Sequence, residues 1–156
     1  MDKRECINKL LATKKLSTNE ECIEFEAALR ELQNDLSVED IDSLSEVFGD
    51  DTEDYEVMFG LIHMIEDMRG EAYLNKIAVC TPKMKEAHEW AMTLNKRIIN
   101  SPEYYTMYIN TVRSLDESEK NSILALLEDV KNDNPKRFAD KVEYLKLQIL
   151  EMENGK

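Results

Sequence analysis

Turn-forming residues are scarce in this chain of 156 residues, which contains four glycines and three prolines. A β-rich protein needs more of both, and apolar positions recur at three- and four-residue spacing nearly throughout, so we predict an all-α fold. No run approaches the roughly 18 apolar residues of a membrane-spanning helix. The opening stretch MDKRECINKLLATKK has scattered charges where a signal peptide is continuously apolar. These absences predict a cytoplasmic protein with no membrane partner.

Histidine and cysteine are also rare. His63 and His88 lack further ligands at metal spacing, and the three cysteines lie far apart. We predict reduced core cysteines, no metal site and no cofactor. Phosphate-binding glycine loops, Gly-x-Ser-x-Gly, His-Glu-x-x-His and Cys-x-x-Cys are all missing, which favours a binding protein over an enzyme. A carboxylate-based enzyme stays open only if Glu56, Glu66 and Asp67 face one another in one pocket.

Charge is distributed unevenly along the chain, whose net charge is −13. Residues 17–71 contain two basic and 18 acidic side chains, residues 1–16 carry a net positive charge, and residues 72–156 are neutral. Such an acidic segment repels nucleic acid and anionic membranes and attracts a cationic partner. We therefore exclude nucleic acid as a partner and expect a basic protein surface.

Helical periodicity and proline positions divide the chain into helices, with Pro82, Pro102 and Pro135 each placed to begin one. Short links predict one domain over residues 1–156, with eight or nine helices packed as antiparallel pairs, and a short α-solenoid is one variant of this packing. The expected helices span 2–14, 18–33, 38–48, 53–69, 71–80, 82–99, 102–113, 116–132 and 135–153.

The stretch FGDDTEDYEVMFGLIHMIED combines five carboxylates within residues 50–56 with an apolar helix. Carboxylates stabilise a helix N-terminus, and Asp51 or Thr52 is the expected cap, but one or two acids suffice for this role. The surplus repels itself, which suggests that some of these acids serve a partner. The segment from Val57 to Ile65 is apolar on all sides and predicts a central helix, in which Gly60 marks a close helix crossing.

Three tyrosines on the predicted 102–113 helix, Tyr104, Tyr105 and Tyr108, suit either a half-buried helix face or a protein interface. The spacing alone does not separate the two roles.

The segments EVFGDDTEDYEVMFGLIHMIED, YLNKI, EWAMTLNKRIINS and YI, between residues 37 and 109, resemble the bacterial immunity protein thirty family. These small helical antidotes belong to polymorphic toxin and contact-dependent growth inhibition systems. The resemblance implies a cytoplasmic protein that binds and blocks the C-terminal domain of a cognate toxin. Tyr55 departs from the pattern, because the family is associated with a histidine at that position.

Together, the charge distribution and the resemblance predict an acidic surface that occludes a cationic toxin, which could be a nuclease. A helical-repeat adaptor that recruits a basic protein is the alternative. The predicted toxin-binding residues are Asp42, Glu46, Asp50, Asp51, Glu53, Asp54, Glu56, Glu66, Asp67, Tyr104 and Tyr105.

Overall fold

The computed structural model describes residues 2–154, and the side chains of residues 2–150. This part of the chain contains helices and no strand, so the predicted all-α fold is confirmed. The α-helices are α1 (Lys3–Thr13), α2 (Asn19–Leu32), α3 (Ile41–Leu44), α4 (Tyr55–Glu66), α5 (Glu71–Cys80), α6 (His88–Ile99), α7 (Pro102–Arg113), α8 (Glu117–Asp133) and α9 (Pro135–Asn154).

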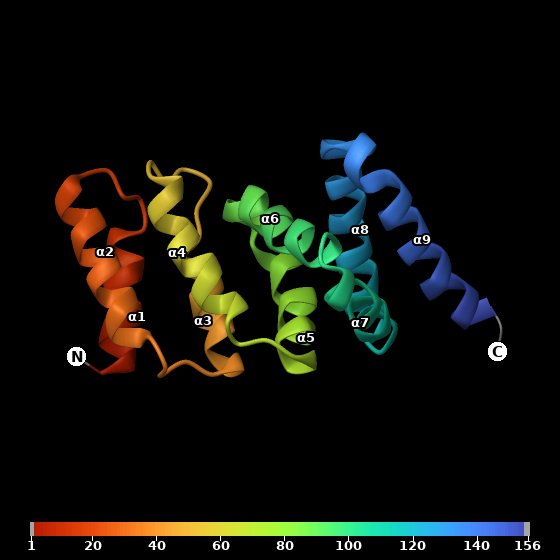
Figure 1. The fold of residues 1–156 in the computed structure, drawn as a ribbon, viewed down its shortest axis with the longest axis horizontal. Helices are drawn as coiled ribbons and strands as arrows, with labels where there is room; N and C mark the ends of the chain where they lie inside the picture. The colour runs from red at the N-terminus through yellow and green to blue at the C-terminus, as the bar shows by residue number, and fades with distance from the viewer. Residues whose placement is uncertain (1, 155–156) are drawn as a thin grey trace.

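The helices form an elongated row, with α1 and α2 at one end and α9 at the other (Figure 1). Besides the consecutive pairs α1/α2, α6/α7 and α8/α9, alternate helices stack on each other: α2 on α4, α3 on α5, α5 on α7, α6 on α8 and α7 on α9. Stacking of alternate helices along one direction is the arrangement of a short α-solenoid, which leaves extended surfaces open to a partner.

Two of the predicted helices are broken. The 38–48 segment consists of the 3₁₀ turn η1 (Val38–Asp40), the single α-turn α3 and the 3₁₀ turn η2 (Ser45–Val47). Its start is tightened by the Asp40 carboxylate, which accepts a hydrogen bond from the Ser37 amide at 2.8 Å. Its end is set by Phe48, whose backbone is extended. Predicting one continuous helix was therefore wrong.

The helix predicted over 82–99 begins only at His88. Two 3₁₀ turns, η3 (Thr81–Lys83) and η4 (Lys85–Ala87), precede it, because Met84 has a non-helical ψ of 65°. Pro82 therefore lies in a 3₁₀ turn. Pro102 and Pro135 begin α7 and α9 as predicted.

Helix α4 supplies much of the core, and its Met58, Leu61, Ile62 and Ile65 are buried. A Cβ at Gly60 would lie 3.1 Å from the Leu29 Cδ1, so α2 and α4 approach closely at this position and the predicted crossing is confirmed. The helix is not covered all round, however. The flank that carries Tyr55, Phe59 and His63 is partly open to solvent, so these side chains form part of the protein surface.

A buried polar network joins η3, α6 and α7. The Asn95 amide donates to the Thr81 hydroxyl at 3.0 Å and to the Ala91 carbonyl at 2.9 Å, and its oxygen accepts from the Tyr108 hydroxyl. Thr81 in turn donates to the Ile77 carbonyl at 2.6 Å. All these side chains are buried, so every polar atom depends on the others for its hydrogen bond.

Replacing Tyr108 with phenylalanine leaves the Asn95 oxygen without its donor inside the core. We expect Y108F to lower the free energy of unfolding by about 1–3 kcal/mol, measured by urea denaturation. The control is Y105F, whose hydroxyl donates to the Lys141 carbonyl in a solvent-exposed contact. Water replaces that bond, so Y105F should cost less than about 1 kcal/mol. Equal losses in the two variants would contradict the assigned role of the network.

Candidate protein-docking surface

The segment from Phe48 to Asp50 is docked on the start of α6 by three kinds of hydrogen bond. The indole Nε1 of Trp90 donates to the Gly49 carbonyl at 3.1 Å, and the Asp50 amide donates to the Glu86 carbonyl at 3.1 Å. The Asp50 carboxylate accepts from the Glu89 amide at 3.1 and 3.2 Å. Asp50 therefore stabilises the N-terminus of α6 inside the fold.

Asp54, and not Asp51 or Thr52, caps α4. Its carboxylate accepts from the Val57 amide at 3.1 Å, and the Cys22 thiol of α2 approaches it at 3.7 Å. Thr52 is buried and its hydroxyl donates to the Lys15 carbonyl. The predicted cap was wrong because residues 51–53 form a turn that is held on the end of α1. In this turn the Glu53 amide donates to the Lys15 carbonyl at 2.8 Å, so the helix begins only after Asp54.

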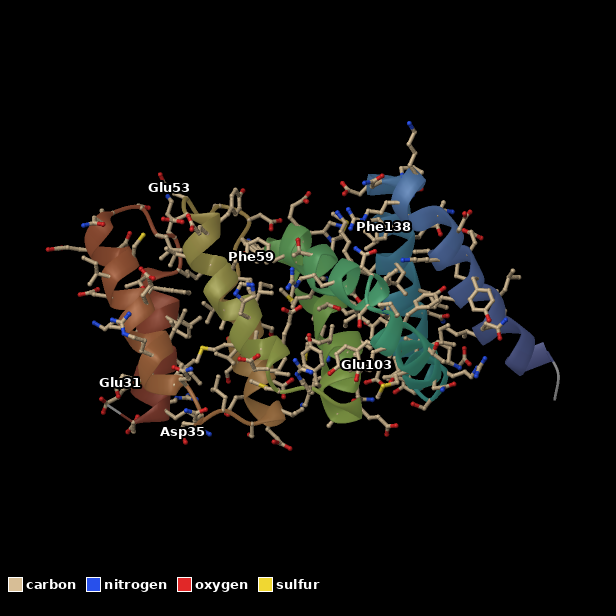
Figure 2. The ribbon with its side chains drawn as sticks, viewed as in Figure 1. Glu31, Asp35, Glu53, Phe59, Glu103 and Phe138 are labelled. Atoms are coloured by element: carbon tan, nitrogen blue, oxygen red, sulfur yellow. The ribbon has the colours of Figure 1, made fainter. Side chains whose placement is uncertain are left out.

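Three acids of the cluster remain: Asp51, Glu53 and Glu56 are exposed, and their carboxylates have no hydrogen-bond or ion-pair partner within the described residues. The Cys22–Asp54 contact places the first turn of α2 beside them. The N-termini of α2 and α4 lie at the same edge of the row, and Glu53 lies far from Glu31 and Asp35 (Figures 1 and 2). We call this edge the acidic edge; its residues are Glu20, Glu24, Asp51, Glu53 and Glu56.

An aromatic strip runs along the open flank of α4 from this acidic edge. It consists of Tyr55, Phe59 and His63, one helical turn apart. The Tyr55 side chain is 58% exposed and its ring centre lies 5.5 Å from that of Trp90, while the Phe59 ring meets Trp90 edge-on at 5.2 Å. Trp90 itself is buried and immobilised by its bond to Gly49. The exposed ring of Tyr55, next in sequence to Asp54 and Glu56, therefore packs on a buried and hydrogen-bonded side chain.

At the C-terminal end of α4, Glu66 is paired with Arg97 of α6 through two hydrogen bonds of 2.6 and 2.9 Å. This ion pair borders a hollow of about 360 Å³ that is also lined by His63, Asp67 and Tyr104. The structure thus brings together the predicted residues Glu66, Asp67 and Tyr104. Glu56 does not line this hollow, so the three-carboxylate convergence required for the enzyme alternative does not occur.

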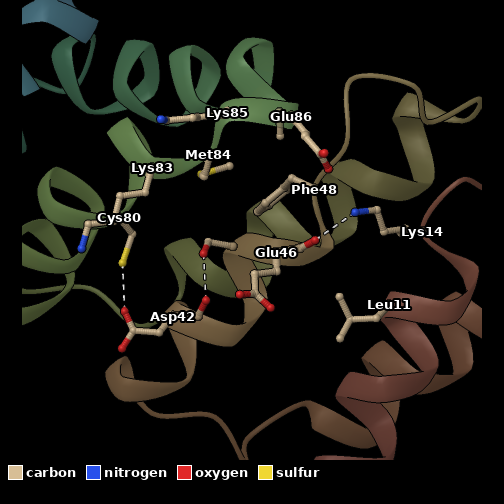
Figure 3. A pocket seen from close by; sticks show the side chains of 12 residues that line it. Leu11, Lys14, Asp42, Glu46, Phe48, Cys80, Lys83, Met84, Lys85 and Glu86 are labelled. Atoms are coloured by element: carbon tan, nitrogen blue, oxygen red, sulfur yellow. Dashed lines mark hydrogen bonds between the residues drawn. The ribbon is translucent and has the colours of Figure 1, made fainter. Parts of the chain in front are cut away.

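Asp42 and Glu46 line a different cleft, of about 630 Å³, between α1, η2 and the η3–η4 turns (Figure 3). Asp42 accepts from Lys76 at 2.7 Å and from the Cys80 thiol at 3.0 Å. The hydrogen bond from Lys76 lowers the pKa of Asp42. The Glu46 carboxylate has no such partner within the described residues, although its backbone carbonyl accepts from Lys14.

The predicted toxin-binding residues are thus spread over several places. Asp42, Asp50, Asp54, Glu66 and Tyr105 all make hydrogen bonds inside the fold. Tyr55 and Phe59 are not among the predicted site residues. Their four-residue spacing next to the acids was the available signal, but Phe59 was assigned to the buried central helix and Tyr55 was noted only as a departure from the family pattern.

Comparison with known proteins places this fold in a family. The family model of Immunity protein 30 matches residues 12–108, which is more than half of the chain. The chain belongs to the Immunity protein 30 family. The match covers α2 to α6 and most of α7, including the acidic edge and the aromatic strip. No curated protein and no solved structure matches the chain.

Membership of the Immunity protein 30 family indicates a toxin-neutralising role, with a cognate toxin as the partner. Within residues 2–154, no helix has the length and apolar character needed to traverse a bilayer. In the same residues, no three histidine, cysteine or acidic side chains come together as a metal-binding group.

Asp50 and Asp51 are neighbours in sequence with different roles, which a pair of substitutions can separate. D50A removes the acceptor for the Glu89 amide and should reduce the free energy of unfolding by about 1 kcal/mol. D51A removes no hydrogen bond within the described residues and should leave stability nearly unchanged. Thermal and urea denaturation of the two variants measure the difference, and equal destabilisation would contradict the cap.

Cys80 lines the 630 Å³ cleft without being a reactive thiol. Burial and the hydrogen bond to Asp42 raise the pKa of Cys80 to about 12, so the thiol stays protonated at pH 8. We expect iodoacetamide to leave Cys80 unmodified in the native protein and to modify it in denaturant, as measured by peptide mass spectrometry. Rapid modification of the folded chain would disprove this assignment.

Proposed function

We propose that this Immunity protein 30 family member binds the C-terminal domain of its cognate toxin through the acidic edge and neutralises it by covering its functional surface. One observation carries the proposal. Asp51, Glu53 and Glu56 lie within four residues of the exposed Tyr55, and their carboxylates have no partner within the described residues. Asp50 and Asp54 are different, because their carboxylates accept hydrogen bonds from helix N-terminal amides and so have a role within the fold.

Charge indicates the kind of toxin that fits. Residues 17–71 carry a net charge of −16, and the N-termini of α2 and α4 concentrate part of it at one edge. A surface of this sign raises the association rate with a cationic protein by roughly 10–10³. Toxins that cleave nucleic acid need basic clefts to hold the phosphate backbone, so we propose a nuclease domain as the target.

Tyr55 adds an exposed aromatic side chain to the acidic edge. Tyrosine contributes a large contact area at low entropic cost, and interface residues of this type slow dissociation when they are shielded from water. Its support by Trp90 means that little side-chain freedom would be lost on binding. A toxin bound at the acidic edge would also contact the aromatic strip, which extends along α4 to the hollow lined by Asp67 and Tyr104. In this proposal inhibition is steric and electrostatic, takes place in the cytoplasm, and requires no chemistry from this chain.

The decisive variant reverses the three unpaired charges: D51K/E53K/E56K. The control, E31K/D35K/E39K, makes the same change in net charge with exposed acids outside the acidic edge, of which Glu31 and Asp35 lie at the opposite edge (Figure 2). We expect the first variant to bind the toxin domain at least tenfold more weakly, mainly through slower association and with a smaller salt dependence. The control should bind nearly as the natural chain does. Surface plasmon resonance at two salt concentrations measures both effects.

Circular dichroism must show that both variants remain helical. Equal affinity of the two variants would contradict binding at the acidic edge. Co-expression with the toxin domain encoded by the adjacent reading frame tests the function itself: an antidote restores growth, whereas a helical-repeat adaptor binds without protecting the cell.

A further inference from the structure

The hollow of about 360 Å³ at the C-terminal end of α4 contains a buried hydroxyl group that the fold does not use. Tyr73 of α5 lines this hollow although it is only 1% exposed. Its hydroxyl has no hydrogen-bond partner within the described residues, whereas that of the equally buried Tyr108 donates to Asn95. A buried tyrosine hydroxyl normally has a partner, so this group is available to a ligand that enters the hollow.

The charges that act on Tyr73 place its hydroxyl at the wall of the hollow. Burial raises the pKa of Tyr73, the Glu66 carboxylate raises this pKa further, and Arg97 lowers it by less. Glu66 and Arg97 line the same hollow. The hydroxyl therefore lies close to both groups, and the negative one has the stronger influence on it.

The ionised side chains around the hollow leave negative charge uncompensated. Glu66 and Arg97 neutralise each other through hydrogen bonds of 2.6 and 2.9 Å. The other ionised residues of the lining are Asp67, Arg69 and Glu103, which are exposed and whose side chains have no partner within the described residues. Two carboxylates against one guanidinium favour a cationic ligand.

We propose that this hollow binds an arginine side chain of a partner protein; the identification of that partner as the toxin rests on the function proposed above. A guanidinium has five N–H donors and no acceptor, so it can donate to the Tyr73 hydroxyl and to the carboxylate of Asp67 or Glu103 at the same time. Its flat face can also pack on the ring of Tyr104, which lines the hollow. A lysine ammonium has three donors and is more strongly hydrated.

The chain already holds one of its own arginines with the same kinds of group. The Arg97 guanidinium is bonded to Glu66 and lies 5.9 Å from the centre of the Phe59 ring. The hollow offers a carboxylate and a ring in Asp67 and Tyr104, together with the free Tyr73 hydroxyl. Since α4 has 12 residues, this site lies about 18 Å from the acidic edge, so one protein domain can contact both.

Titration of the free chain with Nα-acetylarginine amide tests the hollow without the toxin. Chemical shifts in ¹⁵N NMR spectra measure binding at millimolar probe concentration, and the amide signals of Asp67, Tyr73 and Glu103 should move. The matching citrulline derivative has the same shape without the charge and should bind at least about tenfold more weakly.

Two tyrosine variants separate binding from folding. Y73F should weaken binding of the arginine probe about tenfold, because it removes a hydrogen bond to a charged group. Its free energy of unfolding in urea should match that of the natural chain, since the Tyr73 hydroxyl has no partner within the described residues. Y105F changes a tyrosine outside the hollow and should leave probe binding unchanged.

R69Q determines the sign of the charge that the hollow accepts. Removing this unpaired cation should strengthen binding of the arginine probe about twofold or more, whereas a hollow suited to an anion would respond in the opposite way. The assignment would be overturned by weaker probe binding in R69Q, by equal binding of arginine and citrulline, or by unchanged binding in Y73F.

The toxin domain provides the last measurement. Y73F should speed dissociation of the complex and leave its salt dependence unchanged, in contrast to the slower association expected for D51K/E53K/E56K. Equal toxin affinity of Y73F and the natural chain would show that the hollow lies outside the contact. A toxin that does not bind the natural chain would contradict the proposed function alone, because the probe titrations do not involve the toxin.

Discussion

The contact between the Phe48–Asp50 segment and the start of α6 is the constraint on which the surface of this protein depends. In this contact the Gly49 carbonyl accepts a hydrogen bond from the Trp90 indole, and the Asp50 carboxylate accepts one from the Glu89 amide in the first turn of α6. With the indole held, the rings of Tyr55 and Phe59 have a fixed wall to pack against. The direction in which α4 leaves this segment then determines where the remaining acids are displayed. A loop that looks like a simple connection thus positions the whole proposed binding surface.

Acidic residues in this chain have two uses, and the structure separates them. Asp50 and Asp54 satisfy backbone amides at two helix N-termini, and Glu66 neutralises Arg97 between α4 and α6. Such acids contribute to folding, and their charge is already compensated. Asp51 and Glu53 occupy the same short segment, but their carboxylates have no hydrogen-bond or ion-pair partner within the described residues. Repulsion among such acids costs stability in the free protein, and a cationic surface would relieve it on binding.

The sequence was sufficient for features that arise from local chemistry. Scarce glycine and proline, with three- and four-residue spacing, indicated an all-α fold, and Gly60 indicated a close crossing that Leu29 confirms. The break at Met84 was missed, because its ψ angle follows from tertiary packing. Pairings such as Asp42 with Lys76 were equally hidden, since helical periodicity shows which face a residue occupies and not which distant residue it meets. For the same reason, part of the predicted toxin-binding set proved to be engaged inside the fold.

The Asn95 amide has a consequence for how this protein can change. Apolar side chains tolerate small sliding of one helix over another, but an amide bonded to Thr81 of η3 and to Tyr108 of α7 is satisfied in a single alignment. The helices in the middle of the stack therefore keep fixed relative positions. Substitutions of outward-facing side chains do not disturb this packing, so the same fold can present surfaces that fit binding partners of different shape or charge.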